Sequence, residues 1–238
     1  MSPASSGRAQ GVTAYQQIHR HAAASLRAGS LVLVHGAAGG TGAMLCALAR
    51  LHKCRVVATC SARNIAAVKA AGDCVAVIDY ATDWAKAARD AAAGAGSPAG
   101  FDAVFDAIVA KGYLSKGLRL LARGGTYIAY GFTDSSSPGA IALPSAALCL
   151  GRIALQNALF RLFDGKRAAF TNVANDRDGD PASFGDDLRA LVALAKGGQL
   201  RPEVGRVWEF GDAKNALLAI EAGGHRGKQV VRVGPKPE

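Results

Sequence analysis

Short apolar runs alternate along this chain with segments in which apolar residues recur every three or four positions. The clearest case begins with Leu-Val-Leu-Val at residues 31–34, after which Met44, Leu45, Leu48 and Leu51 follow at helical spacing. An unbroken apolar run is typical of a strand in a parallel sheet that is covered on both faces, and the later spacing is that of an amphipathic helix. The pattern therefore predicts a strand, a turn and a helix over residues 31–51.

The same alternation of strand and helix patterns extends as far as residue 131. Strands are predicted at residues 31–34, 55–59, 75–78, 101–108 and 125–130, and helices at residues 11–26, 44–51, 65–71, 83–93 and 114–121. Strands that alternate with helices at this spacing form β–α–β units, which build a parallel sheet. We therefore expect an α/β fold.

Beyond residue 131 the rhythm of the pattern changes. A serine-rich loop is predicted at residues 134–139, an apolar helix at 148–163, a sixth strand at 167–173, a polar loop at 175–181, a helix at 184–196, a strand at 204–210, a helix at 212–221 and a strand at 228–233. We therefore expect about six strands in the main sheet and a further group of elements at the C-terminus.

The turn between the first predicted strand and its helix contains glycines at Gly36, Gly39, Gly40 and Gly42. Glycine lets the backbone approach phosphate groups because no Cβ stands in the way. The N–H groups at the start of the following helix, together with the helix dipole, favour an anion at this point. A strand, a glycine turn and a helix in this order predict a dinucleotide site, and a glycine-rich turn without a ligand is the alternative.

The end of the second predicted strand selects between the two nicotinamide cofactors. NAD enzymes usually place an acidic residue there to hold the ribose 2′-hydroxyl. This chain has Thr-Cys-Ser-Ala-Arg-Asn at residues 59–64, and the nearest acids, Asp73 and Asp79, lie further on. A hydroxyl, a guanidinium and an amide suit a 2′-phosphate, which a carboxylate would repel. The sequence thus favours NADP(H), although an ordinary polar turn that caps the next helix would look the same.

Composition narrows the class of protein further. Half of the 238 residues are hydrophobic and only 6% are aromatic, so the core must consist mainly of Ala, Val, Leu and Ile. The longest apolar runs, near residues 140–150, are interrupted by Pro144 and Ser145, so no membrane span is predicted. Residues 1–10 are small and polar, unlike a signal peptide. The five cysteines form no C-x-x-C pair, which favours reduced thiols in the cytoplasm over a zinc lobe or disulfides.

The formal net charge of +10 raises the question of an acidic partner. The Lys and Arg residues are spread along the chain, and no basic patch with interleaved aromatic residues is visible. We therefore expect no nucleic-acid partner, and the charge agrees better with a general attraction for phosphorylated ligands.

Six short motifs then occur in a characteristic order. They are Gly-Val-Thr-Ala-Tyr at residues 11–15, Val-Leu-Val-His-Gly-Ala-Ala-Gly-Gly-Thr-Gly at 32–42, Ala-Thr-Cys-Ser at 58–61, Val-Ile-Asp-Tyr at 77–80, Phe-Asp-Ala-Val-Phe-Asp at 101–106, and Gly-Gly at 124–125 with Tyr-Gly at 130–131. Together with Gly-Lys-Gln-Val-Val-Arg-Val at 227–233, they resemble the quinone oxidoreductase (zeta-crystallin-like) branch of the medium-chain dehydrogenase/reductases.

This resemblance implies a Rossmann-type doubly wound parallel sheet of about six strands, followed by a remnant of a GroES-like catalytic domain. It divides the chain into a flexible lead at 1–10, a linker helix at 11–30, an NADP(H)-binding Rossmann domain at 31–180, and C-terminal helices and strands at 181–238 that normally join the catalytic domain. It also implies a homodimer formed through the sixth strand, at residues 167–173.

The resemblance also assigns the cofactor NADPH to particular residues. The pyrophosphate would contact Ala38, Gly39, Gly40, Thr41 and Gly42, and the adenosine 2′-phosphate would contact Ser61, Arg63 and Tyr80. The nicotinamide ring would lie near Ile108 and Val109, and its ribose near Tyr130, Gly131 and Phe132. Thr13 and residues 170–172 are weaker candidates for the same site.

The activity implied is a zinc-independent transfer of hydride from NADPH to a quinone or an α,β-unsaturated carbonyl compound. Relatives carry a long catalytic domain before the Gly-Val-Thr-Ala-Tyr motif, whereas ten residues precede it here. Because half of the substrate cleft is therefore missing from this sequence, no catalytic residue and no metal ligand are predicted. The final strands at 204–210 and 228–233 are expected to pair with each other, to pair with another chain, or to stay partly loose. The alternative function is a catalytically impaired NADP(H)-binding fragment or partner subunit.

Overall fold

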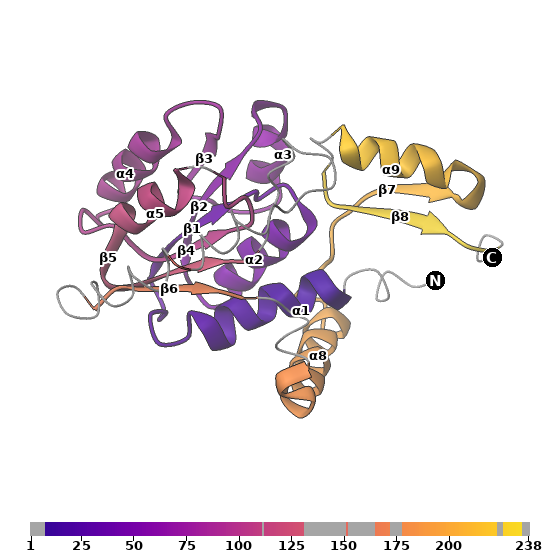
Figure 1. Cartoon of the computed structure of the whole chain (residues 1–238), viewed down its shortest axis with the longest axis horizontal. Helices are drawn as coiled ribbons and strands as arrows, with labels where there is room; N and C mark the ends of the chain where they lie inside the picture. Colours follow the sequence, from indigo (N-terminus) through magenta and orange to yellow (C-terminus); the bar gives the residue numbers. More distant parts are fainter. Residues whose placement is uncertain are drawn as a thin grey trace.

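The computed structural model describes residues 8–110, 112–130, 151, 165–171, 178–222 and 226–234 (Figure 1). The chain enters through helix α1 (Arg8–Gln16), which continues as a short π-helical segment (Gln17–His21). The predicted helix at residues 11–26 therefore begins earlier and ends earlier than its apolar pattern suggests.

A six-stranded sheet forms the centre of the described chain. Its strands are β1 (Leu31–His35), β2 (Arg55–Cys60), β3 (Ala76–Asp79), β4 (Phe101–Asp106), β5 (Leu121–Ala129) and β6 (Arg167–Phe170). They lie in the order β3-β2-β1-β4-β5-β6, and each neighbouring pair is parallel. The order reverses between β1 and β4, which is the point where open α/β sheets bind ligands. The expected doubly wound fold of about six strands is confirmed.

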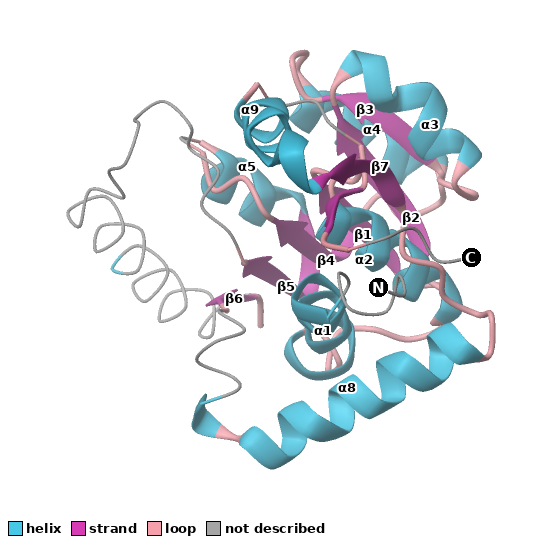
Figure 2. Ribbon diagram, turned by 90° about the vertical axis from the view of Figure 1, so that its right-hand side faces the viewer, coloured by secondary structure: helices cyan, strands magenta, loops and turns pink. Residues whose placement is uncertain are grey.

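Helices cover both faces of this sheet (Figures 1 and 2). The helices that follow the strands are α2 (Gly40–Leu51), α3 (Ile65–Ala70), α4 (Trp84–Gly94) and α5 (Tyr113–Leu120). Along β1, Val32 and Val34 join the core cluster with α1 and α2, whereas Leu31 and Leu33 join the opposite cluster with α4 and α5. An unbroken apolar strand is thus required because successive side chains enter two different cores.

The described C-terminal region builds a second, smaller unit. Strands β7 (Val204–Glu209) and β8 (Lys228–Arg232) pair in parallel, and helix α9 (Ala213–Glu221) connects them. Of the outcomes expected for these two strands, the structure shows that they pair with each other. Before them, α8 (Pro181–Lys196) packs against α1, and Figure 2 shows it below that helix.

The ends of several elements differ from the sequence prediction for local reasons. Strand β4 stops at Asp106 instead of residue 108, because the carboxylate of this residue accepts the backbone N–H groups of Ile108 and Val109 and turns the chain. Strand β5 begins at Leu121 instead of residue 125, with a register irregularity against β4. The predicted loop at 134–139 and nearly all of the predicted helix at 148–163 lie outside the described residues.

Candidate cofactor site

The glycine turn that follows β1 has a conformation that other residues would disturb. Gly36 has a φ of +70°, in the left-handed region that glycine adopts at little cost. The N–H of Gly39 donates to the Gly36 carbonyl at 3.0 Å, and the N–H of Ala37 donates to the Thr59 carbonyl on β2 at 2.9 Å. A Cβ on Gly42 would collide with the Gly36 carbonyl oxygen, so a glycine here lets α2 start directly against the turn.

The start of α2 has two features that suit an anion. Gly39 is its N-terminal capping residue and makes no side-chain capping hydrogen bond. The first turn also contains no acidic residue. The helix is twelve residues long, so its dipole favours negative charge at this end. Residues 38–42, predicted to bind the pyrophosphate, therefore form a cradle that fits such a group.

Two segments that are distant in sequence meet this cradle. A Cβ on Gly40 would overlap the amide oxygen of Gln10, so the side chain of Gln10 from α1 reaches the start of α2. From the other end of the chain, the N–H of Gly227 donates to the Ala38 carbonyl at 3.0 Å, and Gly227 forms a parallel bridge with Gly39. Sequence reasoning missed both contacts, because no local pattern pairs a turn with residues so far away.

The residues predicted to bind the 2′-phosphate come together at the ends of β2 and β3. The Asn64 side-chain amide donates to the Ser61 hydroxyl at 3.1 Å, which fixes the turn that presents the exposed side chain of Arg63. The N–H of Tyr80 donates to the Cys60 carbonyl at 3.0 Å, and the Tyr80 side chain is 43% exposed.

One acidic residue that is distant in the sequence, Asp79, lies beside the end of β2 in the folded chain. Asp79, the last residue of β3, is in register with Cys60 at the end of β2. One of its carboxylate oxygens accepts the N–H of Ala81 at 3.0 Å. The site around Ser61 and Arg63 therefore contains both a cation and a neighbouring carboxylate.

The predicted nicotinamide end follows β4. Ile108 and Val109 are half-buried, and both backbone N–H groups donate to the carboxylate of Asp106. The side chain of Asp106 is fully buried and also accepts a hydrogen bond from the Tyr127 hydroxyl. Val109 has a φ of +49°, which is rare for a β-branched residue.

Tyr130 follows β5 and points its hydroxyl inward. The hydroxyl is buried and makes no hydrogen bond within the described chain, and burial raises the pKa of Tyr130. Its ring packs against the core cluster on the α1 and α2 side. The structure therefore places Tyr130 at the carboxyl end of β5, where it was expected, but buries its hydroxyl in the core.

The remaining candidates have mixed positions. Gly131, Phe132 and Asn172 lie outside the described residues. Thr13 is half-buried on α1, and Phe170 packs against the core on the α4 and α5 side. Thr171 is buried, and its hydroxyl accepts a hydrogen bond from the Gln17 side chain at 2.8 Å, which is a structural link between β6 and the first helical segment.

His35, at the end of β1, is enclosed by other rings. Its Nδ1 lies 2.9 Å from the Thr59 hydroxyl, and its ring meets the rings of Trp84 and Tyr113 edge to face at 4.6 and 5.0 Å. Burial lowers the pKa of His35 to about 4, against a smaller opposing effect of Asp106. The imidazole is therefore neutral at pH 7 and serves the packing of α4 and α5 on the sheet.

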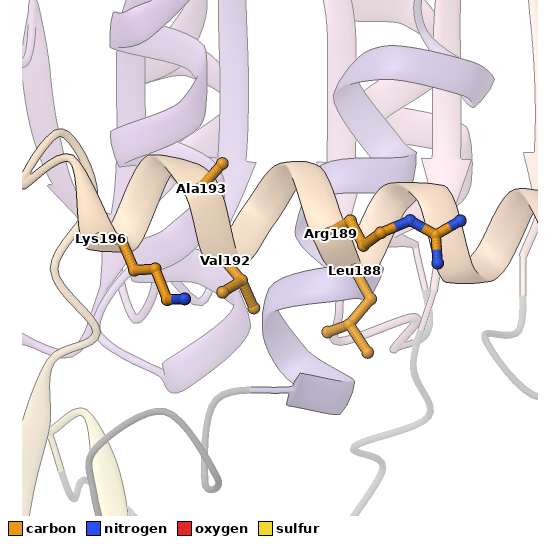
Figure 3. A pocket seen from close by; sticks show the side chains of 5 residues that line it. All are labelled: Leu188, Arg189, Val192, Ala193 and Lys196. Carbon is orange, nitrogen blue, oxygen red and sulfur yellow. The ribbon is translucent and has the colours of Figure 1, made fainter.

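Other features of the described chain offer no second site of this kind. A shallow apolar hollow of about 470 Å³ lies on α8, and the described side chains that line it all belong to that helix (Figure 3). In the part of the chain that the structure describes, no three His, Cys, Asp or Glu side chains gather as metal ligands would. None of the helices described there is long and apolar enough to cross a membrane.

Comparison with known proteins places the chain in a family. A sequence profile described as zinc-binding dehydrogenase matches residues 73–231. The chain belongs to this family. The family name implies zinc, but the described residues of this member do not bring together a set of zinc ligands. No curated protein matches the chain significantly.

Solved structures of oxidoreductases share the fold. A quinone oxidoreductase from Pseudomonas syringae pv. tomato DC3000 matches 93% of this chain and 62% of its own, with a TM-score of 0.70 and 20% identity. The JamJ enoyl reductase matches 92% and 59%, with a TM-score of 0.73 and 22% identity. A mycobacterial protein solved with NADPH matches 93% and 61%, with a TM-score of 0.69 and 24% identity. This dehydrogenase-family chain therefore spans about three fifths of the solved chains that it resembles.

Proposed function

We propose that this protein is an NADPH-dependent oxidoreductase that passes hydride to quinones or α,β-unsaturated carbonyl compounds without zinc. The observation that carries the proposal is the glycine cradle at residues 36–42, where α2 begins without a side-chain cap or an acid. Two solved structures with this fold are a quinone oxidoreductase and an enoyl reductase, and a third is described as a complex with NADPH.

We propose that different segments at the carboxyl edge of the sheet hold different parts of the cofactor. The bound cofactor would supply a hydride from its nicotinamide ring. The start of α2 would hold the pyrophosphate, and the turn after β4 would support the nicotinamide. Because all of these segments follow the carboxyl ends of parallel strands, one extended ligand can contact each of them in turn. Neither His35 nor the Tyr130 hydroxyl is proposed to transfer a proton, since both are buried in the core.

Selectivity for NADPH is proposed to depend on Arg63. This guanidinium is exposed and has no ion-pair partner among the described residues, so it is available to a 2′-phosphate. The Ser61 hydroxyl is held beside it by Asn64. Asp79 lies nearby but accepts a hydrogen bond from its own turn, which partly satisfies its charge.

The first experiment is a calorimetric titration of the purified protein with NADPH and NADH. We expect NADPH to bind more tightly, and Arg63→Glu to weaken NADPH binding about tenfold, the equivalent of one charge-assisted hydrogen bond, while changing NADH binding little. Arg123→Glu is the matched control, because Arg123 is exposed on β5 and the change in net charge is the same. Absence of NADPH binding at high protein concentration would contradict the proposal.

The second experiment follows oxidation of NADPH with a panel of quinones and enones. Turnover supports the proposed reductase. Binding without turnover supports a second candidate, an NADP(H)-binding partner subunit. The observation that favours this candidate is the apolar surface of the C-terminal unit, where the side chains of Phe210, Leu217 and Leu218 are 67%, 63% and 50% exposed.

We also propose a homodimer formed through β6. This strand is at the edge of the six-stranded sheet, and within the described chain it pairs only with β5. An unpaired edge presents N–H and C=O groups that a second copy can satisfy. Light scattering at micromolar concentration tests this proposal, and a monomer alone would contradict it.

A further inference from the structure

The turn after β4 is held in an unfavourable conformation. Val109 has a φ of +49°, and a β-branched residue in this region is strained by about 1–3 kcal/mol. Strain of this size persists only where neighbouring groups over-determine the backbone. The groups that do so here are identifiable.

The carboxylate of Asp106 holds this turn directly. One oxygen accepts the N–H of Ile108 at 2.8 Å and the N–H of Val109 at 3.1 Å. The other oxygen accepts the hydroxyl of Tyr127 from the neighbouring strand β5. Asp106 is 0% exposed, so water does not compete for these hydrogen bonds. The side chain is therefore locked on one side by the sheet and presents its other oxygen to the turn.

This turn lies against the glycine cradle. Strand β4 pairs with β1 so that Phe105 is in register with Val34, which brings the ends of both strands to the same level. A Cβ placed on Gly36 would lie 4.0 Å from the Cβ of Ala107, the residue between Asp106 and Ile108. A ligand anchored by its phosphates at the start of α2 therefore meets the turn that Asp106 shapes.

We propose that Asp106 is a positioning residue, whose carboxylate pre-forms the Ile108–Val109 turn as the support for the nicotinamide half of the cofactor. The inference rests on the proposed function, because only a dinucleotide bound at the cradle extends to this turn. Its physical basis is pre-organisation: a turn already held in its bound shape costs no ordering free energy when the ligand arrives.

Three variants distinguish the two oxygens of the Asp106 carboxylate, one of which faces the turn while the other faces the sheet. Asp106→Ala removes both, and leaves two backbone donors without their acceptor. Tyr127→Phe is the matched control, because it removes the hydroxyl that donates to the sheet-facing oxygen and leaves in place both hydrogen bonds that Asp106 accepts from the turn. Asp106→Asn is the conservative variant, since its amide oxygen can still accept from the turn while its NH₂ group faces the Tyr127 hydroxyl.

We expect Asp106→Ala to weaken NADPH binding at least tenfold, and Asp106→Asn to stay within threefold of the wild type. Tyr127→Phe should lower the melting temperature but leave NADPH binding within twofold. Equal losses of binding in Asp106→Ala and Tyr127→Phe would overturn the proposal, because they would show a general loss of stability. Unchanged binding in Asp106→Ala would overturn it as well.

A second measurement needs neither the cofactor nor a variant. In the free wild-type protein, hydrogen exchange at the Ile108 and Val109 amides should be as slow as in the body of β4. Exchange as fast as that of an unprotected backbone amide would overturn the proposal even if NADPH binds. If the wild type does not bind NADPH but these two amides are protected from exchange, the proposed function is wrong. The conclusion that Asp106 fixes the turn would still stand.

Discussion

The main sheet and the C-terminal unit are both built from parallel strands, yet they bury their strands to opposite degrees. All five residues of β1 are buried, whereas five of the six residues of β7 are exposed. Strand β1 lies between two layers of helices, and β7 has α9 beside it (Figure 1).

This difference shows where the stability of the described chain resides. Parallel strands depend on covered faces, since helices on both sides supply the apolar burial that offsets the entropy of ordering the chain. The unit of β7, α9 and β8 lacks cover on both faces, and several of its large apolar side chains, among them Phe210 and Leu217, remain exposed. We therefore expect it to contribute little to the unfolding free energy.

The largest test compares two phenylalanines. Phe105 on β4 is 0% exposed and Phe210 beside α9 is 67% exposed. Phe105→Ala should lower the unfolding free energy by about 3–5 kcal/mol, because it leaves a cavity in the core. Phe210→Ala should change it by less than about 0.5 kcal/mol. Urea titration measures both, and similar losses for the two variants would contradict the contrast between the regions.

A pH titration sharpens the same contrast through His35. Burial lowers the pKa of His35 to about 4 from an unfolded value of 6.5, so only the unfolded state takes up this proton between those values. The contribution of neutral His35 to the unfolding free energy is therefore complete above pH 6.5. It is lost as the pH falls toward 4, by about 3 kcal/mol in total. Strands β7 and β8 and helix α9 contain no histidine, so none of them holds a residue of this kind.

Urea titrations at several pH values measure this effect. His35→Asn should flatten the dependence of unfolding free energy on pH between 4 and 6.5 by up to one proton. An identical slope in the wild type and His35→Asn would show that His35 is protonated in the native state.

A smaller effect is expected where the two regions touch. Gly227 has a φ of +58°, and a Cβ there would lie 2.6 Å from the Glu203 carbonyl oxygen. Gly227→Ala should cost about 2 kcal/mol and also weaken NADPH binding, because the N–H of Gly227 holds the Ala38 carbonyl of the cradle.

Gly198→Ala is the control for this substitution. Gly198 has a φ of +73° with nothing within 4 Å of the added Cβ, so only the backbone cost of about 1 kcal/mol applies and NADPH binding should not change. Equal effects of the two variants on binding would show that the C-terminal unit does not support the cradle.

Much of the candidate site was predictable because its signals are local. The glycines at 36, 39 and 42 all belong to one turn, and residues 59–64 all lie at the end of one strand, so each signal can be seen within a short stretch of sequence. By contrast, Asp79 reaches the side of Cys60 only through the pairing of β2 with β3. Gln10 and Gly227 meet the cradle from opposite ends of the chain, and no spacing in the sequence encodes such meetings.

The sequence by itself determined the α/β class, the order of strands and helices, and the glycine turn, since hydrophobic period and backbone freedom act over a few residues. Only the tertiary structure decided which of these elements touch. It turned the Tyr130 hydroxyl into the core, paired β7 with β8, and placed the buried carboxylate of Asp106 under the turn that follows its strand. The physical reason is that burial and long-range hydrogen bonds depend on how whole layers pack, which a local pattern does not record.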